Sequence, residues 1–408
     1  MSLDGALSVA SSGVANIARE LAIVSRNVAN ANTPDYAREV ANQTSVIAGG
    51  VGMGVAARPS SRDIDTHLQA QVFRQGGVVA GLLTSQAALG AIDAAQGSPG
   101  HGDDLSSILG KLQDAFAALQ GDPSSQARQA KVVDAAGALA GKVNALSAAY
   151  GAARQSAQDG IVADVNSANA DITVIGKLST EIIGLRASGQ GTAELENLRD
   201  AAMRGLSAVT GVRFLEQSNG DMLAVTAGGL SLPLRDAAPL ATSGAIAGTS
   251  ASYPSGGIPA ITLRGADVTT QFGGGTIGAR IALRDATLPK FQAQLDQFAQ
   301  TLASRFDRQG LTLFTDPSGA VPSATGVPVQ SGYVQYRSFR HLDALYHWPD
   351  FLGLTAMAGV PAGLPAGIRV SDHISLGVIA RAFPPDRVRQ VLAETGKASE
   401  RERACRRR

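Results

Sequence analysis

Apolar residues recur in steps of four and three along the N-terminal end of the chain. This spacing corresponds to about 3.5 residues per repeat, which places the apolar side chains at the a and d positions of a coiled-coil helix. Such a helix cannot bury its apolar face alone, so we predict that it packs against a partner helix in its own chain or in another subunit. We call this face the seam; it comprises Leu3, Leu7, Ala10, Val14, Ile17, Leu21, Val24 and Val28.

An asparagine-rich turn follows the seam. Asn30 and Asn32 tolerate backbone conformations that end a helix, and Pro34 disfavours helical geometry at Thr33. Without this turn, an ordinary amphipathic first helix would explain the pattern. Helix and turn together resemble the N-terminal signature of the flagellar rod, hook and hook-associated proteins, whose first helix ends in N-x-A-N-x-x-T-P-x-Y. The residues that carry the resemblance are Asn27, Ala29, Asn30, Thr33, Pro34 and Tyr36.

Further helical patterns occupy much of the remaining chain. Between Ser125 and about Leu185, apolar residues recur in steps of three and four. This spacing predicts one helix about 90 Å long, at about 1.5 Å per residue. Gly151 and Gly160 weaken this helix by about 1 kcal/mol each relative to alanine, so a bend near Gly160 would fit. The other apolar faces at helical spacing predict helices over 63–95, 105–119, 192–209 and 287–308.

Extended structure is predicted in two places. Residues 36–47 and 51–58 read as two extended pieces around a glycine-rich turn. Residues 210–283 are rich in Gly, Ser, Thr and Pro and contain short apolar runs, which favours a small all-β domain. Within it, Asn219-Gly220 separates two alternating runs and predicts a hairpin whose two turn residues both have positive φ.

The long helix, the passage to the β domain and the glycine turn at 273–278 resemble the hook-associated protein 1 (FlgK) family over about residues 1–320. We therefore predict a mainly α fold, an elongated helical bundle of long heptad helices with an all-β insertion. The predicted segments are an axial coiled-coil helix with extended segment (1–60), a helical bundle domain (61–209), the β domain (210–283), a returning bundle helix (284–322), a linker (323–368) and a basic tail (369–408).

The tail differs from the body in charge. The whole chain of 408 residues has a net charge of +1, but residues 369–408 carry +5 and the remainder −4. About three dozen residues of the tail (369–404) resemble the N-terminal segment of an insertion-element-4-type transposase. The family's closing heptad helix is not found in the sequence. We therefore expect a truncated or chimeric product whose first helix is poorly packed in the single chain.

No catalytic, cofactor-binding or metal-binding residues are predicted. His101 lies beside Asp103 and Asp104, but helix capping explains these acids. The glycines at 50–54 and 273–275 lack the spacing of a nucleotide-binding or phosphate-binding loop. The body contains no cysteine, since Cys405 is the only one, and we find neither a secretory signal nor an apolar run of about 18 residues that would span a membrane.

The resemblance implies a non-enzymatic structural component of the bacterial flagellum at the hook–filament junction, secreted without a cleaved signal peptide. It implies self-assembly into a ring through the terminal heptad helices. The implied partners are the hook protein, the second hook–filament junction protein and the flagellar export apparatus. No small-molecule substrate, cofactor or nucleic acid is expected. Two alternatives stay open: another rod or hook axial protein, and a DNA-binding fragment of a mobile-element protein, which rests on the tail alone.

Overall fold

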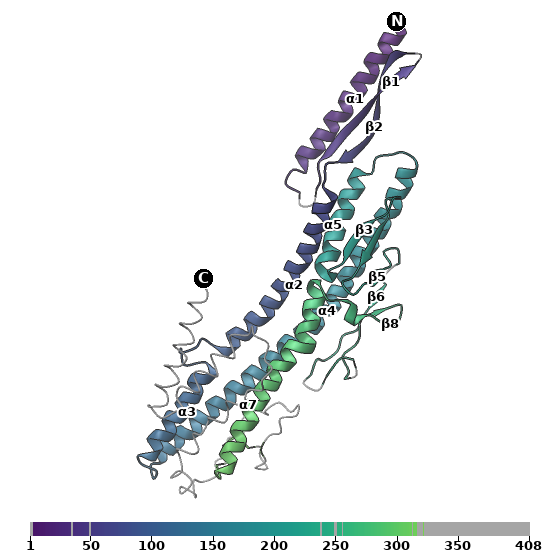
Figure 1. The fold of residues 1–408 in the computed structure, drawn as a ribbon. Coiled ribbons are helices and arrows are strands. Elements are labelled where there is room, and N and C mark those ends of the chain that lie inside the picture. Colours follow the sequence, from purple (N-terminus) through teal and green to yellow (C-terminus); the bar gives the residue numbers. More distant parts are fainter. Residues whose placement is uncertain are drawn as a thin grey trace, which may run out of the picture. The chain divides into compact units, whose positions relative to one another are not determined.

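The computed structural model describes residues 3–33, 36–48, 50–236, 239–248, 251–254, 256–311, 313–315 and 321. The predictions for residues 323–368 and 369–408, and the expected lack of a closing heptad helix, lie outside these residues. Most of the described residues lie in helices, and the strands form only small sheets (Figure 1). The predicted mainly α fold with a small β part is therefore confirmed.

Each helix predicted from apolar spacing is present within a few residues of its predicted bounds. The α-helices of the described part are α1 (Leu3–Ala29), α2 (Thr66–Gln96), α3 (Leu105–Gln120), α4 (Gln126–Ala187), α5 (Ala193–Thr210), α6 (Gly275–Ala282) and α7 (Leu288–Arg308). The side chain of Asp104 caps α3 by accepting the backbone N–H of Ser107 at 3.0 Å. Asp104 thus has the capping role that the sequence suggested.

The longest helix, α4, is continuous over 62 residues. Gly151 and Gly160 both lie inside it and do not end it. At Gly160 the missing side chain makes room for another residue, because a Cβ there would lie 2.2 Å from Nη1 of Arg280. Arg280 in turn donates to Asp164 on α4 at 2.9 Å. Gly160 therefore leaves room for this ion pair beside the helix.

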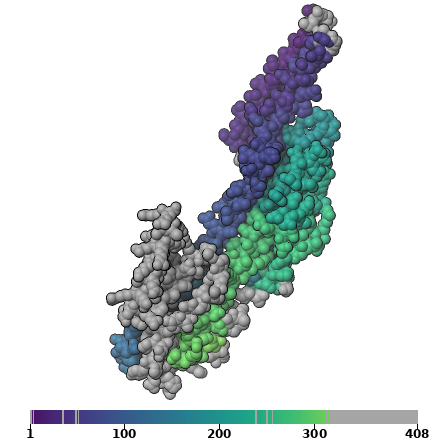
Figure 2. All heavy atoms as spheres, in the orientation of Figure 1, coloured from purple at the N-terminus to yellow at the C-terminus, as the bar shows by residue number. Residues whose placement is uncertain are grey.

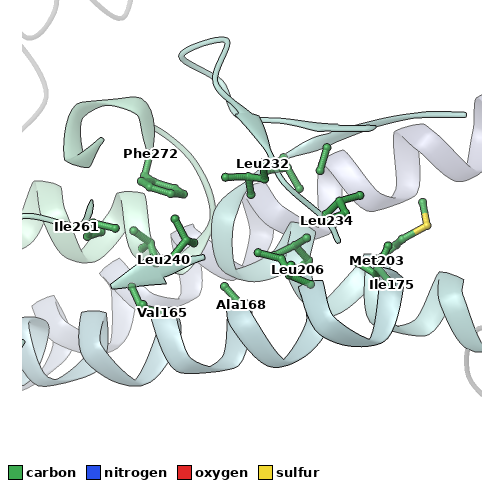
Figure 3. Close-up of a cluster of buried hydrophobic side chains, with 14 of the residues drawn as sticks. Val165, Ala168, Ile175, Met203, Leu206, Leu232, Leu234, Leu240, Ile261 and Phe272 are labelled. Atoms are coloured by element: carbon green, nitrogen blue, oxygen red, sulfur yellow. The ribbon is translucent and has the colours of Figure 1, made fainter. Parts of the chain in front are cut away.

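The chain folds into two compact units, and α4 contributes to both. The first unit comprises residues 1–89 and 153–287. Its core lies between α4, α5 and the short strands, and Figure 3 shows side chains from these elements converging. Ile172, Ile175, Leu206 and Ile277 are fully buried there. The alternating steps of three and four along α4 place its isoleucines on this one face.

The second unit comprises residues 90–152 together with the described residues from 288 onwards. In its described part, α3, the first half of α4 and α7 surround a separate core. Leu112, Leu119 and Leu139 are buried in it, and the rings of Phe116 and Phe306 lie 5.8 Å apart. All of them except Phe306 belong to the apolar faces from which the helices were predicted.

Three small antiparallel sheets complete the described elements. The extended pieces predicted after the first helix form a hairpin of β1 (Glu39–Ala48) and β2 (Val51–Arg62). A sheet of β3 (Arg213–Glu216), β4 (Met222–Val225) and β5 (Ser231–Leu232) follows α5. The third sheet consists of β6 (Leu240–Ala241), β7 (Thr262–Leu263) and β8 (Ala266–Asp267). A short 3-10 helix, η1 (Thr269–Gln271), comes next, and a π-helical turn, η2 (Leu283–Thr287), lies between α6 and α7.

Two local predictions about residues 210–283 are wrong. The β3–β4 hairpin exists, but only Gly220 of its turn has positive φ, at 88°. The turn closes through hydrogen bonds from Gly220 N–H to Gln217 O and from Gln217 N–H to Asp221 O, so the loop is longer than a two-residue turn. Residues 275–282, which the sequence suggested were still β, form α6, because Ile277 is drawn into the core directly after the Gly274–Gly275 turn.

We predict that Leu206→Ala destabilises the protein far more than Leu198→Ala. Both residues lie on α5, but Leu206 is fully buried whereas Leu198 is 55% exposed. Emptying the buried site should cost about 2–5 kcal/mol of unfolding free energy. The exposed change should stay within about 0.5 kcal/mol. Urea unfolding of the two variants measures the difference, and equal losses would contradict this description of the core.

Candidate functional site

The seam of α1 is open to solvent over its whole length. Its seven large apolar residues are between 55% and 88% exposed, and Ala10 is exposed as well. In the space-filling view, the purple atoms of α1 form an open surface beside the β1–β2 hairpin (Figure 2). Monomeric soluble proteins rarely expose apolar surface in such a continuous line, so the seam is a candidate binding surface.

A different face of α1 holds the helix to the hairpin. Asn16 donates from Nδ2 to Oε1 of Gln43 at 2.7 Å, and the backbone N–H of Val55 donates to Oγ of Ser12 at 3.3 Å. Ile23 is almost fully buried on the same side. We call this the hairpin-facing stripe. Its partly or fully buried residues are Val9, Ser12, Asn16, Glu20, Ile23 and Asn27.

The hairpin approaches α1 closely at Gly54. A Cβ on Gly54, whose φ is 110°, would lie 2.3 Å from Oγ of Ser12. Only glycine combines this backbone conformation with so short an approach. The glycine pattern at residues 50–54 therefore includes a packing position between helix and hairpin.

The first helix was expected to be poorly packed in the single chain, and the exposure of its seam agrees with that expectation. The hairpin-facing stripe, in contrast, packs in the chain. The stripe was not expected because the prediction considered apolar residues alone. The packed face is mostly polar.

The asparagine-rich turn fastens the end of α1 to the start of β1. Asn27 donates from Nδ2 to the carbonyl oxygen of Glu39 at 2.8 Å. Its Oδ1 accepts from the backbone N–H of Glu39 and from the hydroxyl of Tyr36, both at 2.9 Å. Arg26 pairs with Glu39 at 3.2 Å. Two residues of the turn motif thus meet in one hydrogen-bonded cluster.

The other motif residues shape the turn itself. Asn30 donates from Nδ2 to the carbonyl oxygen of Arg26 at 3.1 Å, and the Thr33 hydroxyl donates to Oδ1 of Asn30 at 3.2 Å. Ala29 is the last residue of α1. Pro34 lies outside the described residues. The described motif residues therefore end the helix and do not form a chemical site.

A polar cluster connects the hairpin to α5. The side chain of Asn197 exchanges two hydrogen bonds with the backbone of Ala37, at 3.1 and 3.2 Å. Arg62, at the end of β2, pairs with Glu196 at 2.8 Å and also with Asp200. Arg62 and both carboxylates are largely buried. Buried, hydrogen-bonded charges fix a geometry because moving one partner leaves the other unpaired.

Glu196 is the centre of this cluster. It also accepts from the Thr192 hydroxyl at 2.6 Å and from Arg186 at 2.8 Å. Burial by itself would raise the pKa of Glu196. The hydrogen bonds from Thr192 and Arg186 and the positive charges of Arg62 and Arg186 outweigh it and lower the pKa to about 2. Glu196 is therefore ionised at neutral pH and holds both arginines.

The hairpin-facing stripe and the Glu196 cluster were not predicted from the sequence. The stripe had a signal, since Ser12, Asn16, Ile23 and Asn27 also follow helical spacing. Polar residues at that spacing normally mark a solvated face, so only the hairpin partner reveals their role. The cluster had no local signal, because Arg62 and Glu196 are 134 residues apart in the sequence.

No group of residues that could hold a metal ion occurs among the residues that the structure describes. Near His101, burial opposes ionisation of Asp104, but hydrogen bonds from Ser106, Ser107 and Gly100 hold the pKa of Asp104 well below its usual value. This carboxylate is committed to capping α3. The Gly274–Gly275 turn packs against the end of α5.

Two helices of the described part are long and apolar enough to cross a membrane by length and composition alone, Gly5–Ala29 and Thr66–Gln96. No apolar run long enough to span a membrane was predicted from the sequence. Arg19 and Glu20 lie in the middle of the first helix, and Arg74 lies in the second. Charged groups inside a bilayer are costly. Each helix also packs on other elements of the chain through another face.

Two family models match the chain. Residues 89–319 match the flagellar hook-associated protein FlgK helical domain, and residues 7–36 match the flagella basal body rod protein. Together the two matches include the turn motif and most of the seam. They give no support to the predicted resemblance of residues 369–404 to a transposase. No curated protein matches.

A solved structure of the flagellar hook junction protein FlgK from Burkholderia pseudomallei is similar to this chain, with 24% sequence identity and a TM-score of 0.47. The similarity covers 63% of this chain and 45% of the other. This chain thus spans less than half the length of that protein.

We predict that Asn27→Ala loosens the start of β1. The substitution removes three hydrogen bonds and leaves the backbone N–H of Glu39 unpaired, which should cost about 1–3 kcal/mol. Amide hydrogen exchange at Glu39 should accelerate accordingly. Asn32→Ala is the matched control, because Asn32 is exposed and its side chain has no hydrogen bond to the described residues. Unchanged exchange at Glu39 in Asn27→Ala would contradict the assigned role.

We predict a specific pH dependence for Glu196→Gln. The pKa of Glu196 falls from 4.5 to about 2 on folding, so its ionised form stabilises the protein fully above pH 4.5. This contribution disappears as the pH falls from 4.5 towards 2. The difference in melting temperature between wild type and Glu196→Gln should therefore be large at pH 7 and shrink across that window. The exposed neighbour Glu194, changed to Gln, should show no such difference; a constant gap for Glu196→Gln would refute the electrostatic role.

Proposed function

This chain belongs to the family of flagellar hook-associated protein FlgK, and from that premise we propose that it is a structural component of the hook–filament junction. We propose that it assembles with copies of itself into a ring, and that the seam of α1 forms the contacts. The hook protein and the second hook–filament junction protein are the proposed neighbours. The flagellar export apparatus is the proposed route out of the cell.

The observation that carries this proposal is the exposure of the whole seam. Val14, Leu21 and Val28 are each more than half exposed, although they recur at the spacing of a coiled-coil core. Burying them against another helix would remove their apolar surface from water, which favours association by about 25 cal/mol per Å². A structural protein that polymerises has a use for such a surface.

The attachments of α1 support the same role. Asn16 and Asn27 hold the helix to the hairpin, and the Glu196 cluster holds the hairpin to α5. A helix fixed in this way loses little conformational freedom when it binds a partner, which lowers the entropic cost of association. The polar contacts thus present a preformed apolar surface.

The residues of the β1–β2 hairpin add to the exposed apolar surface of this region. Ile47 and Met53, near the turn of the hairpin, are exposed. We propose that they contact neighbouring subunits when the α1 seam is engaged. We also propose that the helical bundle domain makes the lateral contacts between subunits.

We predict that Leu21→Asp abolishes addition of the purified chain to isolated hooks. Leu21 is 68% exposed, so the change should leave the monomer folded. In the assembled seam it would bury an unpaired charge at a cost of about 3–5 kcal/mol, a loss of a hundredfold or more in affinity. Addition can be followed by electron microscopy and by co-sedimentation with hooks.

Ala22→Asp is the matched control for this experiment. Ala22 is the adjacent residue, is exposed, and belongs neither to the seam nor to the hairpin-facing stripe. It should add to hooks as the wild type does. The proposal fails if Leu21→Asp adds as well as Ala22→Asp does, or if the wild type does not add at all.

A further inference from the structure

A second exposed apolar stripe runs along α2. Its large apolar residues again alternate in steps of the heptad, and each is between 38% and 64% exposed. They are Leu68, Val72, Val79, Leu82 and Leu89, with Gln75 and Gln86 completing the spacing. Val78 and Leu83 are also exposed on α2 and flank this line. We call this set the α2 stripe. It lies wholly within the first unit and is separate from the seam of α1.

The opposite face of α2 is already occupied. Phe73 is buried in the core, and the Ser207 hydroxyl of α5 donates to its carbonyl oxygen at 2.9 Å. Gly77 and Gly81 permit close packing: a Cβ on Gly77 would lie 2.7 Å from Ser207 O, and one on Gly81 would lie 2.8 Å from Gly275 O. The helix therefore cannot turn its stripe inward without breaking these contacts.

We propose that the α2 stripe pairs with the α2 stripe of a second copy of this chain, in parallel and in register. The a positions hold Val72 and Val79, and the d positions hold Leu68, Leu82 and Leu89. β-branched residues at a combined with leucine at d favour two-stranded parallel coiled coils. The residue types therefore specify both the kind of partner and its direction.

The polar residues of the stripe fit an identical partner. Gln75 and Gln86 carry amides that both donate and accept, so the same residue on each copy can pair with its equivalent. The stripe contains no charged residue. The charged residues of α2 are Arg74 and Asp93, and both lie outside the stripe. Two copies therefore meet without like-charge repulsion, and a strongly charged partner would find no complementary group.

The length of the α2 stripe determines how tightly we expect two copies to bind. From Leu68 to Leu89 it extends about 33 Å, at about 1.5 Å per residue. A free peptide of this length would be marginally helical, but α2 is already held by its other face, so pairing does not have to order it. Only a narrow line of side chains is buried, so we expect a weak dimer in the micromolar range.

Cysteine cross-linking of the full chain tests the proposal. Cys405, the only cysteine, is replaced by serine, and Leu21→Asp is added so that the α1 seam does not contribute to association. In a parallel, in-register pair, Leu82→Cys on one copy faces Leu82→Cys on the other. Mild oxidation at micromolar protein should then give a disulfide-linked dimer. The control is Ala70→Cys, because Ala70 is exposed on the same helix but lies off the stripe.

Three outcomes overturn the proposal. The first is a yield of dimer for Leu82→Cys no higher than for Ala70→Cys. The second is a disulfide that joins a Leu68→Cys chain to a Leu89→Cys chain in a mixture of the two, which would mean antiparallel pairing. The third is dimerisation that persists in sedimentation when Leu82→Asp is introduced. Hook addition does not enter this test, so failure of the pairing on α2 is distinguishable from failure of the function assigned to the α1 seam.

Discussion

The arrangement of the N-terminal region depends on two faces of α1 that differ in chemistry and in burial. Polar groups make most of the contacts of α1 inside the chain, and the apolar seam is left exposed. Asn16 and Asn27 hold α1 to the hairpin, and Arg62 pairs with Glu196 to hold the hairpin to α5. Hydrogen bonds and buried ion pairs are directional, so they fix the orientation in which the seam is presented.

Helix α2 likewise has one packed face and one exposed apolar face, but its packed face is built differently. Here the inward face is formed by Phe73 and by glycines whose missing side chains let α5 and α6 approach closely. Glycine weakens an isolated helix, but close backbone packing offsets that cost. Gly160 of α4 is a further case, since it gives room to the Arg280 side chain. Gly77, Gly81 and Gly160 are thus packing positions, whereas helix propensity alone would treat them as weak points.

The helices were predictable from sequence because their buried faces are apolar and periodic. Leu112 and Leu119 of α3, and Ile172 and Ile175 of α4, are buried as their spacing indicated. The seam was equally visible as a pattern, but its exposure was not, because a heptad does not say where its partner is. The hairpin-facing stripe escaped prediction for the complementary reason: polar residues reveal a packed face only when the partner is known.

Interactions between distant parts of the sequence were beyond prediction from a single chain. Nothing near Arg62 indicates Glu196, and nothing near Gly54 indicates Ser12. The turn at Gly220 could not be predicted in detail either, because an Asn-Gly pair fits hairpin loops of several lengths. The structure has a loop longer than two residues, with Glu216 opposite Met222.

Hydroxyl-radical footprinting of the dilute monomer tests the central claim most directly, because it reports the exposure of individual side chains. The account predicts strong labelling of Leu7, Leu21 and Val28 on the seam and weak labelling of Ile23 on the hairpin-facing stripe. Protection of the seam residues in the monomer, together with strong labelling of Ile23, would contradict it.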